Sequence, residues 1–341
     1  MLNSFQARQG ALQDPATAPV AAQQVLMDAT TAAAATATQI ARLRAAGAGT
    51  VLVLNLPDIG HTPLAYATPA ATELMTLASQ RFNDTLDSEL ARDKGKLIVL
   101  DTYAMFNELI ATPARFGLRN VTTPACPGDS NQCDRNALVA PGANRTYLFA
   151  DAVHPTGIGH EFIVDYALSV MQAPARIGLL AEAPLAGARA SLQAIDERLR
   201  TRDDSPAPQA YATYQHISDR QRDEGAWNPG MGNRIDMLNL GVDGAVGPHW
   251  MVGAGVAQIQ HDASLGDHAG SLRLGQTLLS AYARYRLHAW SAALAGSIGY
   301  LDYRKVSRDF SIGPARLREQ GATSGTANAL SALTHYDWQA G

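Results

Sequence analysis

The sequence predicts two units of different fold class, an α/β domain followed by an antiparallel β-domain with long strands. From about residue 20 to residue 180, helical patterns alternate with short apolar runs, as in a parallel sheet flanked by helices. A proline-bearing break follows at Ser205-Pro206-Ala207-Pro208. Beyond it, apolar and small or polar residues alternate with period 2, which is typical of β-strands.

The length and charge of the chain exclude some classes of protein function. With 341 residues, the chain is long enough for two units that each bury their own core. The formal net charge is −4 and the basic residues are scattered without runs, which excludes the electrostatic pattern of a nucleic-acid binder. No uninterrupted apolar stretch reaches about 18 residues, so the sequence predicts no transmembrane helix, but a membrane barrel stays open.

The α/β domain is assigned to residues 1–180, and residues 181–206 are expected to form a helical linker. Helices are predicted from apolar residues that recur with helical spacing, and strands from short apolar runs. The expected elements are helices over 20–46, 74–90, 103–109 and 162–171, and strands over 51–54 and 96–100.

Long strands distinguish the second domain, residues 207–341. Near its middle, Trp290, Leu294 and Ile298 fall on one face of a strand and Ser291 on the other. Such strands exceed the roughly 5 to 6 residues usual in soluble sheets and the roughly 9 to 11 needed to cross a bilayer. The predicted strands cover 209–222, 233–246, 249–261, 273–288, 289–306 and 326–339.

Aromatic residues near strand ends favour an outer-membrane β-barrel. Trp250, Trp290, Tyr300 and Tyr303 would suit the interfacial girdles of such a barrel. A soluble β-sandwich also has alternating strands and stays open on pattern alone, whereas strand length favours the barrel. Since common bacterial barrels have roughly eight strands or more, about half a barrel is expected, with a truncated C-terminus.

The N-terminus and the cysteines bear on export. Residues 1–6 lack the basic and apolar regions of a secretory signal peptide, so either the protein stays inside or its start is missing. Cys126 and Cys133 lie in a segment rich in Pro, Gly, Asp and Asn that is typical of an exposed loop. A disulfide between them would fit an exported protein. Two unpaired surface thiols remain the alternative, because sequence does not supply the geometry of a bridge.

The sharpest chemical signal lies in a loop between an apolar strand and an amphipathic helix. Asp151 precedes His154 by three residues at the predicted mouth of the α/β sheet, where active sites of such folds lie. In a hydrolase, His154 would be the general base toward a serine hydroxyl, and Asp151 would fix the imidazole tautomer. From spacing alone, a surface turn that caps a helix fits better than a catalytic pair.

Longer motifs around this pair resemble a known family. Asp151-Ala152-Val153-His154-Pro155-Thr156 resembles the last block of the GDSL, or SGNH, serine esterases and lipases, in which Asp and His complete a triad. Residues 54–63 are similar to that family's strand and turn of the type Asn-Leu-Pro-Asp-Ile-Gly-x-Thr-Pro, and Asp101-Thr102-Tyr103 fits a later strand end. The alternation around residues 299–303 resembles the barrel of the autotransporter subset.

The resemblance implies an autotransporter esterase or lipase that hydrolyses carboxylic esters by a Ser-His-Asp acyl-enzyme route. It implies an outer-membrane location with the passenger on the cell surface. The implied partners are an ester or lipid substrate and the barrel-assembly machinery. In the family, the serine lies in a Gly-Asp-Ser-Leu block and further glycine and asparagine residues form the oxyanion hole. These blocks are expected upstream of residue 1, so this chain alone is expected to be inactive.

Several similar patterns are interpreted as coincidental or structural rather than catalytic. Residues 128–130 spell Gly-Asp-Ser and residues 142–144 spell Gly-Ala-Asn, but both lack the strand that holds a nucleophile elbow. Asp58 and His61 are expected to form a turn in which Asp58 binds backbone groups. No phosphate-binding loop and no cluster with metal-ligand spacing occurs, so neither a cofactor nor a metal is predicted.

Two other functions stay open. The first is a non-catalytic surface-displayed or adhesin-like autotransporter fragment, which stop codons directly before Met1 would favour over an upstream Gly-Asp-Ser block. The second is a soluble hydrolase with an appended carbohydrate-binding sandwich. That protein would express residues 207–341 in soluble form without detergent.

Overall fold

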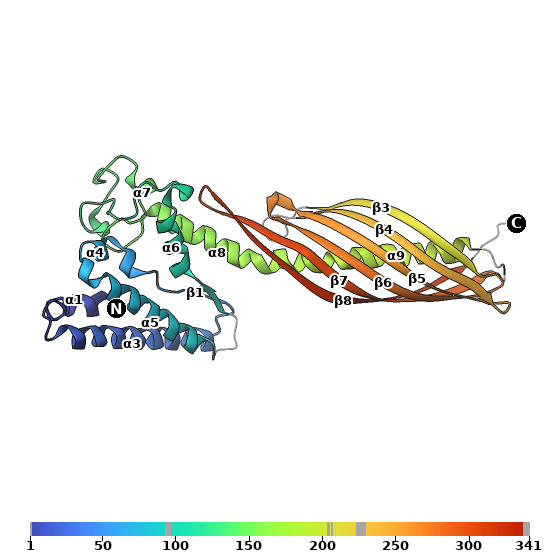
Figure 1. The fold of residues 1–341 in the computed structure, drawn as a ribbon, viewed down its shortest axis with the longest axis horizontal. Helices are drawn as coiled ribbons and strands as arrows, with labels where there is room; N and C mark the ends of the chain where they lie inside the picture. Colours follow the sequence, from blue (N-terminus) through green and yellow to red (C-terminus); the bar gives the residue numbers. More distant parts are fainter. Residues whose placement is uncertain (1, 93–96, 203–204, 206, 223–229, 337–341) are drawn as a thin grey trace. The chain divides into compact units, whose positions relative to one another are not determined.

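The computed structural model describes the chain except residues 1, 93–96, 203–204, 206, 223–229 and 337–341. It forms two compact units, one of Met1–Met171 with Ser311–Ala315 and the other of Gln172–Phe310 with Arg316–Gly341. The first unit is rich in helices, whereas one antiparallel sheet dominates the second (Figure 1). The predicted order, an α/β domain followed by a β-domain, is confirmed.

Eight α-helices begin before residue 158 in the described part of the chain. They are α1 (Leu2–Ala7), α2 (Gln9–Gln13), α3 (Ala18–Ala45), α4 (Pro63–Tyr66), α5 (Thr72–Leu90), α6 (Thr102–Ala111), α7 (Ala143–Thr146) and α8 (Gly157–Gly178). The sequence of α3 is rich in alanine, which has the highest intrinsic helix propensity. Its buried Ala33 and Ile40 pack against Leu86 and Leu90 of α5. Among the described residues, no helix has both the length and the apolar composition needed to cross a membrane.

Two short strands form the sheet of the first unit. β1 (Val51–Leu54) and β2 (Leu97–Leu100) pair in parallel, with Val51 opposite Leu97. Parallel neighbours require a long crossover, and α5 supplies it. Val53 packs into the core that α3 and α5 share. The predicted parallel pairing is therefore present in these two strands, while Lys96 of the second predicted strand lies outside the described residues.

Six long strands form the sheet of the second unit, in the order in which they occur along the chain. They are β3 (Gln209–Gln221), β4 (Met231–Val246), β5 (Trp250–Leu265), β6 (Gly270–Leu287), β7 (Trp290–Ile312) and β8 (Ala315–Tyr336). Each is at least 13 residues long, which confirms the predicted long strands. β3 and β8 are the two edges, and the sheet is not closed among the described residues.

The last strand begins earlier than predicted. The sequence pattern placed it over 326–339, whereas β8 starts at Ala315, and residues 337–339 lie outside the described part. Charged side chains interrupt the alternation at the start of β8, but they pair with β7. Arg318 donates from Nε to Asp309 Oδ1 at 2.6 Å. Such cross-strand ion pairs stabilise a sheet without apolar alternation, which is why the pattern missed this part.

The sheet has one apolar face and one face covered by a helix. We call the first the outer face and the second, which packs against the helix α9 (Glu182–Thr201), the inner face. Inner-face positions such as Asn239 and Asp243 are buried. The predicted alternation on β4, β5 and β7 is therefore confirmed. Large exposed side chains of the outer face are Leu238, Leu240, Val242, Val252, Leu279, Leu294 and Ile298.

Two aromatic pairs lie at one end of the outer face. The rings of Trp250 and Tyr285 stand 5.0 Å apart between centroids. The rings of Trp290 and Tyr336 are separated by 4.9 Å. Both tryptophans begin their strands, as an interfacial girdle requires.

The girdle prediction is wrong for Tyr303. Tyr300 is exposed on the outer face, but Tyr303 is buried and donates its hydroxyl to the carbonyl of Leu180 at 2.8 Å. Side chains alternate along a strand with period 2, so residues three positions apart face opposite sides. The two tyrosines therefore cannot share the girdle.

The helix α9 occupies most of the predicted linker and lies along the inner face (Figure 1). Ala188 near its start packs with Met237 and Ile259 of the sheet. Leu199 near its end packs with Met251. Apolar side chains of the helix thus pack against the inner face in two clusters, one near each end of the helix.

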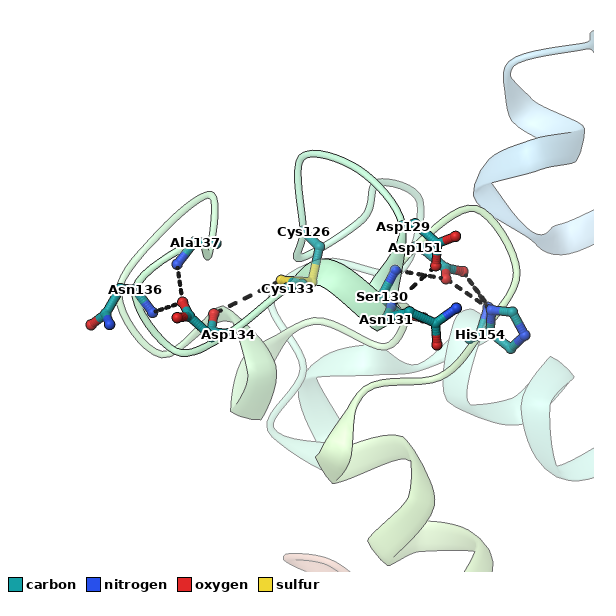
Figure 2. Close-up of a disulfide and its surroundings, with 10 residues drawn as sticks. All are labelled: Cys126, Asp129, Ser130, Asn131, Cys133, Asp134, Asn136, Ala137, Asp151 and His154. Carbon is teal, nitrogen blue, oxygen red and sulfur yellow. Dashed lines mark hydrogen bonds and ion pairs between the residues drawn. A yellow bond between two sulfur atoms is a disulfide. The ribbon is translucent and has the colours of Figure 1, made fainter.

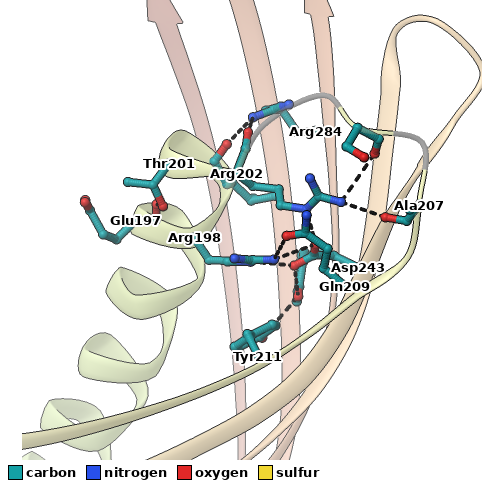
Figure 3. Close-up of polar contacts among 12 residues, drawn as sticks. Glu197, Arg198, Thr201, Arg202, Ala207, Gln209, Tyr211, Asp243 and Arg284 are labelled. Carbon is teal, nitrogen blue, oxygen red and sulfur yellow. Dashed lines mark hydrogen bonds and ion pairs between the residues drawn. The ribbon is translucent and has the colours of Figure 1, made fainter.

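A charge cluster holds the C-terminal end of α9 to the sheet (Figure 3). Asp243 accepts from Nε of Arg198 at 2.8 Å and from Nε of Arg202 at 2.9 Å. The hydroxyl of Tyr282 lies 3.4 Å from the same carboxylate. The side chains of Asp243 and Arg202 are 0% and 1% exposed, so this ion pair is withdrawn from water.

A buried histidine holds the other end of α9. His261 of β5 contacts the carbonyl oxygen of Ala183 through Nδ1 at 3.2 Å and Asn233 Oδ1 through Nε2 at 3.0 Å. The two ends of the helix are therefore fixed at opposite ends of the strands.

Candidate active site

The candidate pair lies on a tight loop that precedes α8. Phe149 and Pro155 form an antiparallel bridge, and the N–H of Ala150 donates to the carbonyl of His154 at 2.7 Å. These backbone contacts close the segment 150–154 into a small ring. These backbone hydrogen bonds therefore help to fix the conformation of the loop.

Asp151 and His154 face each other across this loop (Figure 2). His154 Nδ1 lies 2.8 Å from Asp151 Oδ2 and 3.0 Å from Oδ1. The N–H groups of Val153 and His154 donate to Oδ1 at 3.0 and 2.8 Å. The Asp151 side chain is 10% exposed and that of His154 is 65% exposed. A buried carboxylate therefore orients a ring that is largely open to solvent.

A disulfide loop supplies one more donor to the carboxylate. The N–H of Ser130 donates to Asp151 Oδ2 at 3.1 Å (Figure 2). Ser130 lies between Cys126 and Cys133, which are joined in a disulfide. The N–H of Cys126 donates to the carbonyl of Ala150 at 2.9 Å, so the loop is bound directly to the segment that carries Asp151.

These donors keep Asp151 ionised. Burial alone would raise the pKa of the Asp151 carboxyl, but hydrogen bonds from Ser130, Val153 and His154 outweigh burial and hold the pKa far below its usual range. The side chain is thus a carboxylate at neutral pH and can accept a hydrogen bond from the Nδ1–H of the imidazole.

We expect the Asp151→Asn variant to be less stable than the parent at pH 7 by about 1 to 2 kcal/mol. A carboxyl whose pKa is lower in the folded than in the unfolded state stabilises the fold at pH values above its pKa in the unfolded state, which is about 4. This contribution is lost as pH falls through the folded pKa. The stability difference between parent and variant should therefore shrink below about pH 4. Urea unfolding of the chain between pH 7 and pH 3 measures this difference.

The control for this series is Asp134→Asn. Asp134 is an exposed carboxylate near the disulfide whose bonds go to the N–H groups of Asn136 and Ala137. Its replacement should change stability by less than about 0.5 kcal/mol at neutral pH. A stability difference for Asp151→Asn that does not change with pH would contradict the role assigned to its carboxylate.

Asp58, which lies three residues before His61, has a structural role, as predicted. Asp58 is buried and accepts from the N–H of Gly60 at 2.9 Å and from the hydroxyl of Thr76 at 2.8 Å. Tyr103 donates to its other oxygen at 3.0 Å. His61 stands farther away, with 3.8 Å between Nε2 and the carboxylate. Asp58 therefore fixes the turn after β1.

This turn contacts the loop of the candidate pair. The N–H of Leu64 donates to the carbonyl of Ala152 at 2.9 Å. On the other side, Asn55 binds Asp101 through its amide at 3.0 Å and accepts from the N–H of Tyr103 at 2.9 Å. The polar residues that follow β1 and β2 are thus connected, and the turn they form borders the Asp151–His154 loop.

The contact between Ser130 and Asp151 is one that the sequence does not predict. As sequence motifs, residues 128–130 and 142–144 are coincidental matches, yet Ser130 and Asn144 line the same pocket of about 220 Å³. Ser130 begins a short 3-10 turn, Ser130–Gln132, and bends rather than a strand precede it. It therefore has no nucleophile elbow, and no sequence signal links it to Asp151.

The described residues contain no group of three or more His, Cys, Asp and Glu side chains that could hold a metal ion. His160 binds the carbonyl of Thr156 through Nδ1 at 2.9 Å, as a residue of the first turn of α8. The polar groups that the structure brings together at the site are thus Asp151, His154 and the Ser130 backbone.

Comparison with known proteins adds two findings. Residues 209–341 match the autotransporter beta-domain family. The chain is 33% identical over 331 residues to an uncharacterized protein from the trpE-trpG intergenic region of Pseudomonas putida, covering 91% of this chain and 53% of that protein.

Two further relatives are named as enzymes. Esterase EstA of Pseudomonas aeruginosa is 28% identical over 315 residues, covering 84% of this chain and 46% of the esterase. Lipase 1 of Photorhabdus luminescens is 28% identical over 248 residues, covering 70% of this chain and 35% of the lipase. The chain spans about half the length, or less, of these curated relatives.

Proposed function

We propose that the residues before 209 come from an esterase or lipase passenger of the GDSL class. Residues 209–341 match the autotransporter beta-domain, which indicates an outer-membrane location with a surface-exposed passenger. The observation that supports this proposal most directly is the Asp151–His154 pair, in which a buried carboxylate faces Nδ1 and leaves Nε2 toward solvent. The relatives named as esterase and lipase agree with it.

The proposed chemistry is hydrolysis of a carboxylic ester through an acyl-enzyme. His154 Nε2 takes the proton of a serine hydroxyl while the oxygen attacks the ester carbonyl, and it returns that proton to the leaving alcohol. Water then attacks the acyl-enzyme with the same base. Asp151 holds Nδ1 protonated and stabilises the imidazolium that forms in each half.

In this proposal, the nucleophile and the oxyanion donors belong to a part of the intact protein outside residues 1–341. Ser130 is assigned a supporting role, since its N–H binds Asp151 and bends precede it. The partners are an ester or lipid substrate and the barrel-assembly machinery of the outer membrane. The chain alone should therefore bind an ester poorly and hydrolyse it at background rate.

The test is p-nitrophenyl butyrate hydrolysis by the 341-residue chain refolded in detergent. A second protein, in which the N-terminal part of a related esterase precedes residue 1, is assayed beside it. We expect activity from the extended protein alone. Activity of the chain itself that disappears on Ser130→Ala would make Ser130 the nucleophile and overturn the assignment. An inactive extended protein that is correctly folded would favour a non-catalytic surface-displayed fragment.

Two variants of Ser130 separate its backbone from its side chain. Ser130→Ala keeps the N–H and should leave kcat of the extended protein within about twofold. Ser130→Pro removes the N–H at the first position of a 3-10 turn, which tolerates proline. It should lower kcat about tenfold, because a less firmly held Asp151 orients His154 less well. Equal rates for all three proteins would refute the supporting role.

A further inference from the structure

A row of charged side chains crosses the outer face of the sheet. The strand register places Arg234 opposite Asp262, Asp262 opposite Arg273, and Arg273 opposite Lys305. A register shift on β7 skips Arg304 and turns Lys305 to the same face as Arg273. All of these side chains are exposed. Four adjacent strands therefore present three cations and one carboxylate at one level.

A groove of about 750 Å³ follows this row and includes Arg220 of β3. We call it the outer-face basic groove, defined by Arg220, Arg234, Arg273, Lys305 and Asp262. Asp219 is the second carboxylate of its lining, so four cations stand against two anions. The groove is positively charged in a chain whose net charge is −4.

The cations of the groove are only partly neutralised within the sheet. Arg273 binds Asp262 from Nε at 2.7 Å, and both side chains remain more than half exposed. Among the described residues, this contact engages only Nε of the Arg273 guanidinium. Among the residues that the structure describes, Arg234 and Lys305 form no ion pair. The groove can therefore accept an anion without first breaking a strong internal contact.

A short polar belt separates the groove from the apolar band of the outer face. On β4, Asp236 lies between Arg234 and the exposed Leu238, and on β6, Thr277 lies between Arg273 and the exposed Leu279. Outer-face residues farther along these strands are apolar. Cations beyond this belt would lie at the level of lipid headgroups, with the apolar side chains against acyl chains.

The helix α9 identifies the end of the sheet at which the groove lies. Asp262 follows His261, which binds Ala183 at the start of α9, whereas Asp243 binds the end of the helix. The start of α9, which follows the passenger in the sequence, therefore lies at the same end of the sheet as the groove. Because an autotransporter passenger is exposed on the cell surface, this end faces outward, toward the outer leaflet.

We propose that the outer-face basic groove binds the phosphorylated headgroup of a glycolipid in the outer leaflet. Guanidinium groups match phosphate oxygens with paired hydrogen bonds, and an ammonium group adds a point charge. Basic pockets at the membrane boundary recognise anionic headgroups in this way. Asp262 holds Arg273 in place but lowers the positive charge, so it should limit the affinity.

The test uses the full chain in detergent micelles with lipid A carrying two phosphates as the probe. The dissociation constant is measured for the parent and for Arg234→Gln, Arg273→Gln and Lys305→Gln combined. We expect the combined variant to bind at least about tenfold more weakly. A matched variant loses three exposed arginines of the first unit, through Arg42→Gln, Arg81→Gln and Arg119→Gln. It should bind like the parent.

A single substitution tests the proposal independently, in case the triple variant does not fold. Asp262→Asn removes a carboxylate from the groove and should tighten binding about twofold to fivefold at low salt. An unchanged or weaker affinity would contradict the proposal. Equal weakening by both triple variants would reveal only nonspecific charge attraction. Equal binding of dephosphorylated lipid A would show contact with the apolar band alone, and equally tight binding of inorganic pyrophosphate would show a free-phosphate site instead.

Discussion

Replacing His154 by alanine is expected to lower kcat of the extended protein for p-nitrophenyl butyrate by at least about 10³-fold. The Nε2 atom is the base in both halves of the proposed reaction, and alanine has no group that accepts the serine proton. Binding of the ester depends mainly on other residues, so KM should change far less than kcat. Steady-state rates at several ester concentrations separate the two parameters.

The matched control is His160→Ala. His160 lies six residues farther along, and its Nδ1 binds the Thr156 carbonyl in the first turn of α8. Its loss removes an imidazole of the same size from the same part of the unit, and the rate should stay within a few-fold of the parent. If His154→Ala retains more than a few per cent of the parental rate, His154 is not the general base.

Replacing Asp243 by asparagine is expected to destabilise the second unit by about 3 to 5 kcal/mol. Its carboxylate faces Arg198 and Arg202, and Arg202 is almost fully buried. Asparagine keeps the size of the side chain but leaves two guanidinium groups without their counter-charge. The desolvation of these charges then goes uncompensated, which is the costly part of breaking a buried ion pair.

Urea unfolding in lipid vesicles, followed by tryptophan fluorescence, measures this effect. Asp302→Asn is the control, because Asp302 pairs with Arg304 at 3.0 Å while both side chains are about half exposed. Solvent screens that pair, so the same substitution should cost less than about 0.5 kcal/mol. Similar losses of unfolding free energy for both variants would mean that the contribution of Asp243 to stability does not depend on its burial.

Much of the second unit could be predicted from the sequence, because the inner and outer faces require opposite kinds of residue. Trp290, Leu294 and Ile298 alternate with Ser291 and therefore identified the strand and its faces. The beginning of β8 was missed where cross-strand ion pairs replace that alternation. Tyr303 lies on the inner face because its spacing of three residues from Tyr300 is odd, whereas its position near a predicted strand end suggests the outer face.

The candidate site could be predicted less completely. Asp151 and His154 were recognised because a short loop carries both, so sequence spacing alone brings them together. Ser130 lies 21 residues from Asp151, and Asp243 lies 45 residues from Arg198. Contacts of this kind depend on how irregular loops and separate elements fold back on one another. No local pattern encodes them, and only the three-dimensional arrangement identifies the partners.

Because α9 is attached to the sheet at both of its ends, its length must match the distance between the two attachment points along the strands. Its 20 residues correspond to about 30 Å, which is also the approximate thickness of a bilayer's hydrocarbon core. His261 fixes its beginning and Asp243 fixes its end. One inserted residue would shift everything after it by about 1.5 Å and rotate it by about 100°. Helix and strands must therefore keep matched lengths, and an insertion or deletion on one side requires a compensating change on the other.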